Sequence, residues 1–288
     1  MLQNMYLNFF CKDKDFPFFI QYGRHNDPMF LHGHADFSEL VIILGGSATH
    51  VVNGEEYPLQ KGDVFIINDN TIHGYKHTNH FKICNIMFQP SFFLDEKNDL
   101  KGLPGFQALF VLEPALAKQK GIQQCLSLSE KDFEEINQIM VQLHQEYLTH
   151  ARGYQTMITC LFLQMVTKLS RLYEVPTKQT ETDILSLANP AAYIERHFRE
   201  DISVEKLSEM ANMSTRHFRR IFHDIYGISP LKYINSLRIQ QAAKLLVSTD
   251  LSMTEIAIQC GFSDANYFST KFKEATGKSP MAFRKAPS

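Results

Sequence analysis

Apolar and polar positions form the same pattern twice near the end of the chain. Over residues 218–225 apolar side chains recur at i, i+3, i+4 and i+7, which is the spacing of one helical face. Residues 268–275 repeat the aromatic positions at a constant interval, and both segments end in Gly followed by Ser-Pro. Glycine tolerates the left-handed conformation that ends a helix, and Ser-Pro starts the next one. These pairs predict a duplicated helical unit: Phe218/Phe268, Phe222/Phe272, Gly227/Gly277, Ser229/Ser279 and Pro230/Pro280.

A shorter helix is predicted before each repeated segment, over residues 203–211 and 252–260, and a further helix over 231–247 joins the two units. A turn of three residues follows each short helix. Helix, tight turn and helix is the helix-turn-helix arrangement, whose second helix enters the major groove of DNA. The sequence therefore predicts two helix-turn-helix units and double-stranded DNA as a partner.

The helix faces opposite the apolar stripes carry the candidate DNA contacts. Arginine fits guanine and neutralises phosphates, asparagine fits adenine, and lysine suits phosphate. A solvated surface is the alternative for any single polar face, but the duplication favours DNA recognition. The candidates are Arg216, Arg220 and His223 in the first unit and Asn266, Thr270 and Lys273 in the second.

Residues 207–284 resemble the DNA-binding domain of the AraC/XylS family of bacterial transcription regulators. The resemblance rests on the segments LSEMANMSTRHFRRIFHDIYGISPLKYINSLR and IAIQCGFSDANYFSTKFKEATGKSPMAFR, where Gly, Phe, Ser-Pro and Arg positions agree together. It implies base contacts from the early residues of both recognition helices, which adds Arg219 and Asp264 to the candidates. It also implies an activator that acts on RNA polymerase as a homodimer.

The earlier part of the chain has a different pattern from residue 39 onward. Short β-type runs (ELVIIL, SATHVVN, EEYPLQ and VFIIN) are separated by glycine-containing turns, and Asn53-Gly54 is a hairpin signal. Such runs indicate a small antiparallel barrel or jelly roll.

Histidines and a glutamate in this region carry the candidate ligand chemistry. His32 and His34 point to the same side of a strand. The spacing H-x-H-x4-E-x6-G, followed by Gly62 and His73, resembles the two motifs of the cupin superfamily. In metal-binding cupins these positions hold a divalent ion, so the resemblance implies His32, His34, Glu39 and His73 as ligands of Zn, Ni, Fe or Mn.

Three interpretations of these four residues stay open. They bind a metal, they bind a small effector directly so that no cofactor is required, or they hydrogen-bond within the barrel mouth. The segments HGHADFSELVII and INDNTIHGYKHT resemble the sensor domains of L-rhamnose regulators in the AraC/XylS family, which implies a sugar as effector. Arg24, Tyr75 and His77 are further candidates for effector binding.

Two other classes compete with an effector-controlled regulator. One is a metal-dependent cupin enzyme fused to a DNA-binding domain, for which no separate acid/base pair is identifiable. The other is a constitutive DNA-binding protein with an inert barrel. We expect a regulator without enzymatic activity.

The expected fold class is α+β multidomain, with a cupin-like β-barrel (jelly roll), a helical hairpin and an all-α tandem helix-turn-helix domain. Residues 1–128 form the effector-binding domain, 129–174 a helical hairpin, 175–183 a polar linker and 184–288 the DNA-binding domain. The hairpin either packs on its own barrel or forms a dimer interface, which the family resemblance favours.

Charge and composition agree with this division. The net charge of −2 combines −5 over residues 1–182 with +3 over 183–288, and a mildly basic second part suits DNA. The five cysteines form no C-x-x-C pair, and no apolar run has the length of a membrane span. We expect a cytoplasmic protein without membrane contact.

Overall fold

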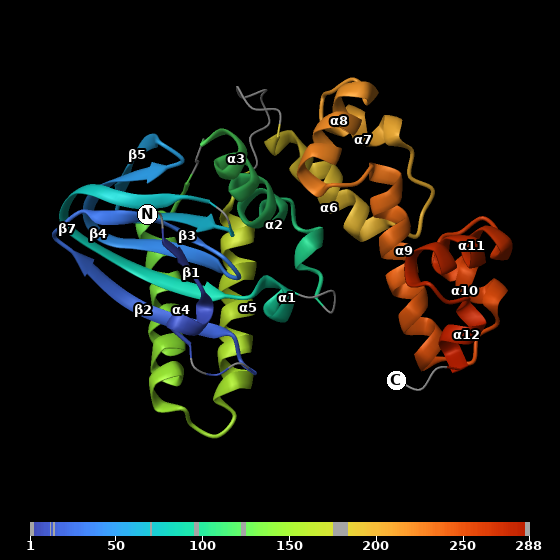
Figure 1. Cartoon of the computed structure of the whole chain (residues 1–288), viewed down its shortest axis with the longest axis horizontal. Coiled ribbons are helices and arrows are strands. Elements are labelled where there is room, and N and C mark those ends of the chain that lie inside the picture. The colour runs from blue at the N-terminus through green and yellow to red at the C-terminus, as the bar shows by residue number, and fades with distance from the viewer. Residues whose placement is uncertain are drawn as a thin grey trace. The chain divides into compact units, whose positions relative to one another are not determined.

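The structure is a computed structural model that describes residues 3–11, 13, 15–69, 71–94, 98–121, 125–174 and 184–285 (Figure 1). The chain divides into two compact units, Met1–Pro176 and Thr177–Ser288. The first is rich in strands and the second is helical, which confirms the predicted fold class. The linker predicted over 175–183 lies outside the described residues.

Two long antiparallel strands organise the first unit: β4 (Ser38–Val52) and β7 (His73–Phe88). Their pairing shifts register between Ile43 and Thr49, so each strand has two halves that belong to different parts of the sheet. The first half of β4 and the second half of β7 pair with β6 (Asp63–Ile67) and β2 (Phe18–His25). The other halves pair with β5 (Glu55–Gln60) and β3 (Met29–His34).

Two short strands extend this sheet. β1 (Gln3–Met5) runs parallel to β3, and β8 (Leu126–Ser127) pairs with β6. The described strands thus form one bent eight-stranded sheet, as expected for a jelly roll. Its inward side chains make an apolar core: Val41, Ile43, Ala48, Leu59, Phe65, Ile67, Tyr75, Phe81 and Ile83.

A helical hairpin of α4 (Glu130–Thr149) and α5 (Tyr154–Leu172) packs against the sheet within this unit. Ser129 caps α4 by accepting a hydrogen bond from the Asp132 backbone N–H. Phe18 of β2 contacts Phe162 of α5 with ring centroids 5.7 Å apart. The predicted hairpin is therefore confirmed, and one of its faces covers its own sheet.

Shorter helices lie between the sheet and the hairpin in sequence. They are α1 (Pro90–Phe93), α2 (Pro104–Phe106), a π-helical segment (Gln107–Leu112) and α3 (Glu113–Lys120). A side chain at Gly105 would place its Cβ 1.9 Å from the Ser170 carbonyl oxygen, so only glycine permits the approach of α2 to α5.

The second unit contains α6 (Ala188–His197), α7 (Val204–Met210), α8 (Thr215–Tyr226), α9 (Pro230–Ser248), α10 (Met253–Gln259), α11 (Ala265–Thr276) and α12 (Pro280–Lys285). The predicted short helices are confirmed as α7 and α10, and α9 joins the two helix-turn-helix units. Helix α6 precedes them and carries no motif of the repeat.

The repeated residues fill equivalent structural roles. Phe218, Phe222, Phe268 and Phe272 are fully buried, and Gly227 and Gly277 end α8 and α11 in the left-handed conformation with φ 72° and 74°. Among the helices of the described residues, none has the length and apolar character needed to cross a membrane.

Candidate ligand site and DNA-binding surface

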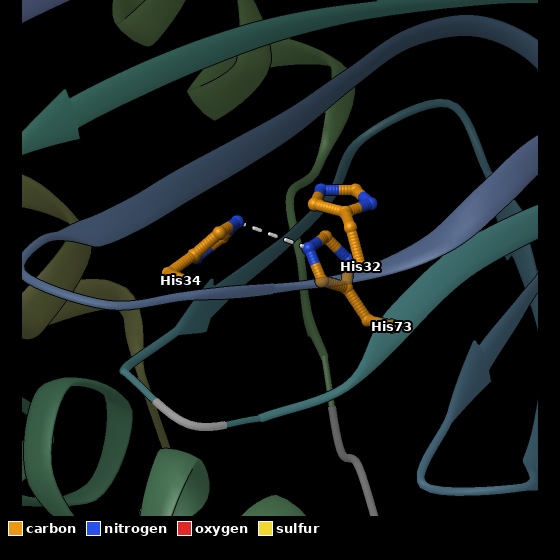
Figure 2. Close-up of side chains that lie close together, drawn as sticks. All are labelled: His32, His34 and His73. Carbon is orange, nitrogen blue, oxygen red and sulfur yellow. Dashed lines mark hydrogen bonds between the residues drawn. The ribbon is translucent and has the colours of Figure 1, made fainter. Parts of the chain in front are cut away.

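Three histidines from two strands converge inside the first unit (Figure 2). His32 and His34 lie on β3, and the strand register places His73 of β7 opposite His32. Nε2 of His73 lies 3.2 Å from Nε2 of His34. One ring nitrogen of each histidine lies within 4.8 Å of the others, and the three side chains are buried.

Glu39 of β4 completes the group. Its Oε2 lies 3.4 Å from Nε2 of His34 and 3.7 Å from Nε2 of His73, and the residue is 3% exposed. The structure therefore brings together all four residues predicted from the cupin-like spacing. We call them the His-Glu cluster.

Glycine makes the close approach of these strands possible. A Cβ on Gly74, next to His73, would lie 2.9 Å from the Met29 carbonyl oxygen of β3. A Cβ on Gly33, between the two β3 histidines, would lie 3.0 Å from Oδ1 of Asn4. A larger residue at position 74 would separate β7 from β3, whereas one at position 33 would displace the Asn4 side chain of the neighbouring β1.

Burial determines the electrostatics of the cluster. Desolvation, followed by the nearby His32, lowers the pKa of His34 to about 3. Desolvation also holds the pKa of His73 well below its usual value and raises the pKa of Glu39 to about 8. The imidazoles are therefore neutral near pH 7 and offer lone pairs, and a cation among them would favour the ionised carboxylate.

The donor set fits a divalent metal ion. Two ligands of a tetrahedral ion with bonds of about 2.0–2.1 Å lie about 3.3 Å apart. The distances from His34 Nε2 to His73 Nε2 and to Glu39 Oε2 are 3.2 and 3.4 Å. Nδ1 of His32 lies 3.1 Å from the Phe30 carbonyl oxygen, to which it can only donate, so its Nε2 keeps a lone pair for a ligand.

A fourth buried histidine was not identified from the sequence. His50 of β4 is fully buried, and its Nε2 lies 3.2 Å from Nδ1 of His73. Its ring stacks on Phe65 and Tyr75 with centroids 4.8 and 4.9 Å away. The available signal was strand alternation, since His50 has the same phase as the buried Ala48 in the run SATHVV.

The three further effector candidates differ in solvent exposure and in their distance from the His-Glu cluster. Tyr75 is buried beside the cluster, and its hydroxyl has no hydrogen-bond partner among the described residues. Arg24 and His77 are exposed. His25 faces the interior, with its ring 6.5 Å from that of Tyr75, so its neighbour Arg24 points outward. The structure does not bring Arg24 or His77 to the cluster, which corrects their grouping with Tyr75.

The predicted DNA contacts all lie on exposed positions of the two recognition helices or their N-caps. Arg220 contacts Asp224 and His217 within its own helix, at 3.5 and 3.1 Å. Arg219 lies 4.0 Å from Glu205 of α7. The exposed set is Arg216, Arg219, Arg220 and His223 on α8, and Asp264, Asn266, Thr270 and Lys273 at or on α11.

Asp264 has a structural role that the sequence pattern did not reveal. It is the N-cap of α11, where its Oδ1 accepts a hydrogen bond of 2.7 Å from the Tyr267 backbone N–H. An N-cap carboxylate of this kind stabilises the start of a helix. Its contribution to DNA binding remains a prediction.

Comparison with known proteins agrees with both parts of the structure. Residues 16–166 match the family described as AraC-like ligand binding domain, and residues 207–286 match the family described as helix-turn-helix domain. The HTH-type transcriptional activator RhaS of Enterobacter sp. (strain 638) is 29% identical over 256 residues, which cover 87% of this chain and 86% of that protein. RhaS of Escherichia coli O1:K1 is 27% identical over 253 residues, with the same coverage of each chain.

Among solved structures, this chain is similar to the DNA-binding domain of AdpA, which was determined in complex with a target DNA. The two share 36% sequence identity in the matched region. The match has a TM-score of 0.33 and covers 34% of this chain and 89% of that domain. The ligand-binding match alone spans more than half of the present chain. The chain therefore belongs to the AraC family of DNA-binding transcription regulators, with an N-terminal ligand-binding domain and a C-terminal helix-turn-helix region.

Proposed function

We propose that this regulator activates transcription when a sugar binds inside its jelly roll. The observation that carries the proposal is the convergence of three imidazoles, a carboxylate and a phenol whose hydroxyl has no hydrogen-bond partner in the described part of the chain. The relatives reported above are named transcriptional activators, and the sensor segments resemble those of sugar regulators. A cytoplasmic location follows from its proposed action on promoter DNA.

The chemistry of the region suits a ligand rich in hydroxyl groups. Such ligands need convergent hydrogen-bonding groups beside an apolar or aromatic wall. Phe37 stacks on His34 with centroids 4.3 Å apart, and Tyr75 presents a buried hydroxyl without a described partner. Leaving a buried hydroxyl unpaired costs about 1–3 kcal/mol, so a sugar hydroxyl that pairs with Tyr75 would recover this free energy.

We also propose that the His-Glu cluster holds a divalent ion. The donor atoms of His34, His73 and Glu39 lie 3.2–3.7 Å apart, close to the spacing of ligands around one ion. A bound ion would supply a Lewis-acidic position for an effector oxygen. Direct binding of the effector without metal is the alternative, and a chelator distinguishes the two.

The second unit is proposed to read promoter DNA through α8 and α11 and to act on RNA polymerase as part of a homodimer. Exposed apolar side chains on the hairpin, Val141 and Leu148 of α4 and Met157 of α5, support self-association.

The effector must bind one conformation of the protein more tightly than another, because a ligand shifts an equilibrium only by differential affinity. An enzymatic role is not proposed, since both parts of the chain match families of regulators.

A thermal-shift screen of the full-length protein against a panel of sugars, with and without chelator, tests these proposals. One sugar should raise the melting temperature selectively, and the same sugar should change the affinity for promoter DNA. Loss of the shift with chelator would support the metal, and its persistence would support direct binding. No shift with any sugar would contradict a sugar effector.

A further inference from the structure

We infer that His50 is a positioning residue that orients His73 and sets its tautomer, so that Nε2 of His73 is available to a divalent metal ion. The inference rests on the proposed metal site and adds a residue that lies outside the His-Glu cluster. Its basis is the contact between His50 Nε2 and His73 Nδ1, 3.2 Å long and buried on both sides.

The two nitrogens of His73 have different partners. Nδ1 faces His50, whereas Nε2 faces His34 Nε2 at 3.2 Å and Glu39 Oε2 at 3.7 Å. A neutral imidazole carries one proton, so protonation of Nδ1 leaves the lone pair on Nε2. His50 secures this arrangement when its own Nε2 accepts the proton of His73 Nδ1.

Packing gives His50 one orientation. Its ring lies between Phe65 and Tyr75, with interplanar angles of 30° and 25°, and it has no solvent exposure. The His50 and His73 planes are nearly perpendicular, at 86°. A ring held on both faces cannot swing away, so its Nε2 stays directed at His73.

His32 shows the same arrangement with another acceptor. Its Nδ1 faces the Phe30 carbonyl oxygen at 3.1 Å, which leaves its Nε2 unprotonated. His73 has a histidine in the place of this carbonyl. Because a histidine nitrogen can donate or accept, the direction of the His50–His73 hydrogen bond decides whether His73 can bind metal.

The test uses full-length protein and Zn²⁺ alone, with affinity measured by competition against a chelator of known zinc affinity. His50→Phe keeps an aromatic ring between Phe65 and Tyr75 but removes the acceptor. His50→Gln restores an acceptor of similar reach. His25→Phe is the matched control, because His25 also lies beside Tyr75 but faces Phe81, with its ring centroid 6.4 Å away.

We expect His50→Phe to weaken zinc binding by about 10–100-fold, the usual effect of losing a partner of a metal-bound histidine. His50→Gln should recover most of the affinity, and His25→Phe should leave it unchanged. Wild-type affinity in a folded His50→Phe variant would overturn the inference. Equal losses in His50→Phe and His50→Gln would also overturn it, since they would indicate packing alone.

A second measurement separates this inference from the metal proposal. The ¹⁵N chemical shifts of the His73 ring in metal-free protein report which nitrogen carries the proton. We expect a protonated Nδ1 in the wild type and a mixture or a protonated Nε2 in His50→Phe. If the wild type binds no zinc, the metal proposal fails, and the shifts still decide the role of His50. A protonated Nε2 in the wild type, or unchanged shifts in the variant, would overturn that role.

Discussion

Oε2 of Glu39 lies 3.4 Å from Nε2 of His34, and both side chains are removed from solvent. Because burial raises the pKa of Glu39 to about 8, folding of the metal-free chain near pH 7 requires this carboxyl to take up a proton, whereas the amide of glutamine has the same shape and no charge. We therefore expect Glu39→Gln to lose the zinc-dependent rise in melting temperature and to equal or exceed the wild type in melting temperature without metal. The free energy of unfolding of the wild-type protein should rise by about 2.7 kcal/mol at a free zinc concentration of 100 times Kd.

Thermal unfolding with zinc and with chelator checks this expectation. Glu56→Gln is the control, because Glu56 is an exposed carboxylate paired with Lys76. A full zinc response in Glu39→Gln would show that Glu39 is not a ligand. A large loss of stability without metal would instead indicate a structural hydrogen-bonding role.

Arg216 and Lys273 should contribute to DNA binding in different ways. Arg216→Ala is expected to reduce the binding free energy for the target site by about 1–3 kcal/mol and to relax specificity at one base pair. The reason is that arginine can bind guanine through two hydrogen bonds. Asn266→Ala should act similarly at another base pair. Lys273→Ala should weaken binding to all sequences and reduce the salt dependence, because a phosphate contact carries no base information.

The measurement is a set of binding isotherms on a selected target and its single-base variants at several salt concentrations. Equal losses on every sequence for all three variants would contradict the assigned roles.

Two glycines with left-handed backbone should differ in their tolerance of alanine. Gly277 has φ 74° and no heavy atom within 4 Å of an added Cβ, so Gly277→Ala should cost about 1–2 kcal/mol from backbone conformation alone. Gly261 has φ 86°, and an added Cβ would lie 2.3 Å from the Arg199 carbonyl oxygen. Gly261→Ala should therefore cost clearly more. Urea denaturation of both variants checks the order, and equal costs would show that the Arg199 contact is absent.

The capping box of α10 predicts a pH dependence of stability. Ser252 Oγ accepts from the Glu255 N–H at 3.2 Å, and Glu255 Oε2 accepts from the Ser252 N–H at 2.8 Å. The hydrogen bond from the Ser252 backbone is the main cause that lowers the pKa of Glu255. The unfolded chain then binds the proton more readily. The stabilisation of the folded state by ionised Glu255 is therefore fully present above the unfolded pKa of about 4.3. It is lost as the pH falls through the lower pKa of the folded state.

Glu255→Gln keeps a hydrogen-bond acceptor but no longer titrates. The free energy of unfolding of wild type should therefore approach that of the variant as the pH falls below about 4. A constant difference between the two at all pH values would contradict this. Ser252→Ala removes the cap itself and should lower the free energy of unfolding by about 0.5–2 kcal/mol near neutral pH.

Leu148 on α4 should contribute to self-association. Its side chain is 62% exposed on a helix that also packs against β2 of the sheet. We expect Leu148→Glu to lower the dimer affinity without unfolding the protein, because a carboxylate is disfavoured in an apolar interface. Sedimentation across a concentration series measures this, with the exposed Gln145→Glu as a control for added charge. An unchanged affinity would place the interface elsewhere.

Local pattern was sufficient for most of the secondary structure and for the class of the protein. The helices of the repeat follow from apolar spacing, serine caps and terminal glycines, all of which act within a few residues. For the same reason the exposed faces of α8 and α11, with Arg216 and Asn266, were predictable before any contact was known. The spacing of His32, His34, Glu39 and His73 also identified the group that the fold brings together.

Tertiary structure alone decided the surroundings of these residues. His50 became a neighbour of His73 because β4 and β7 pair in a register that shifts at bulges, and such a register depends on contacts between distant segments. The pairing of β2 with β7 turns Arg24 outward, and the folded sheet encloses the hydroxyl of Tyr75. The sequence by itself thus determined the helices, the duplicated unit and the potential ligands. The direction of each strand side chain and its partner across the sheet required the folded chain, because both depend on register and burial.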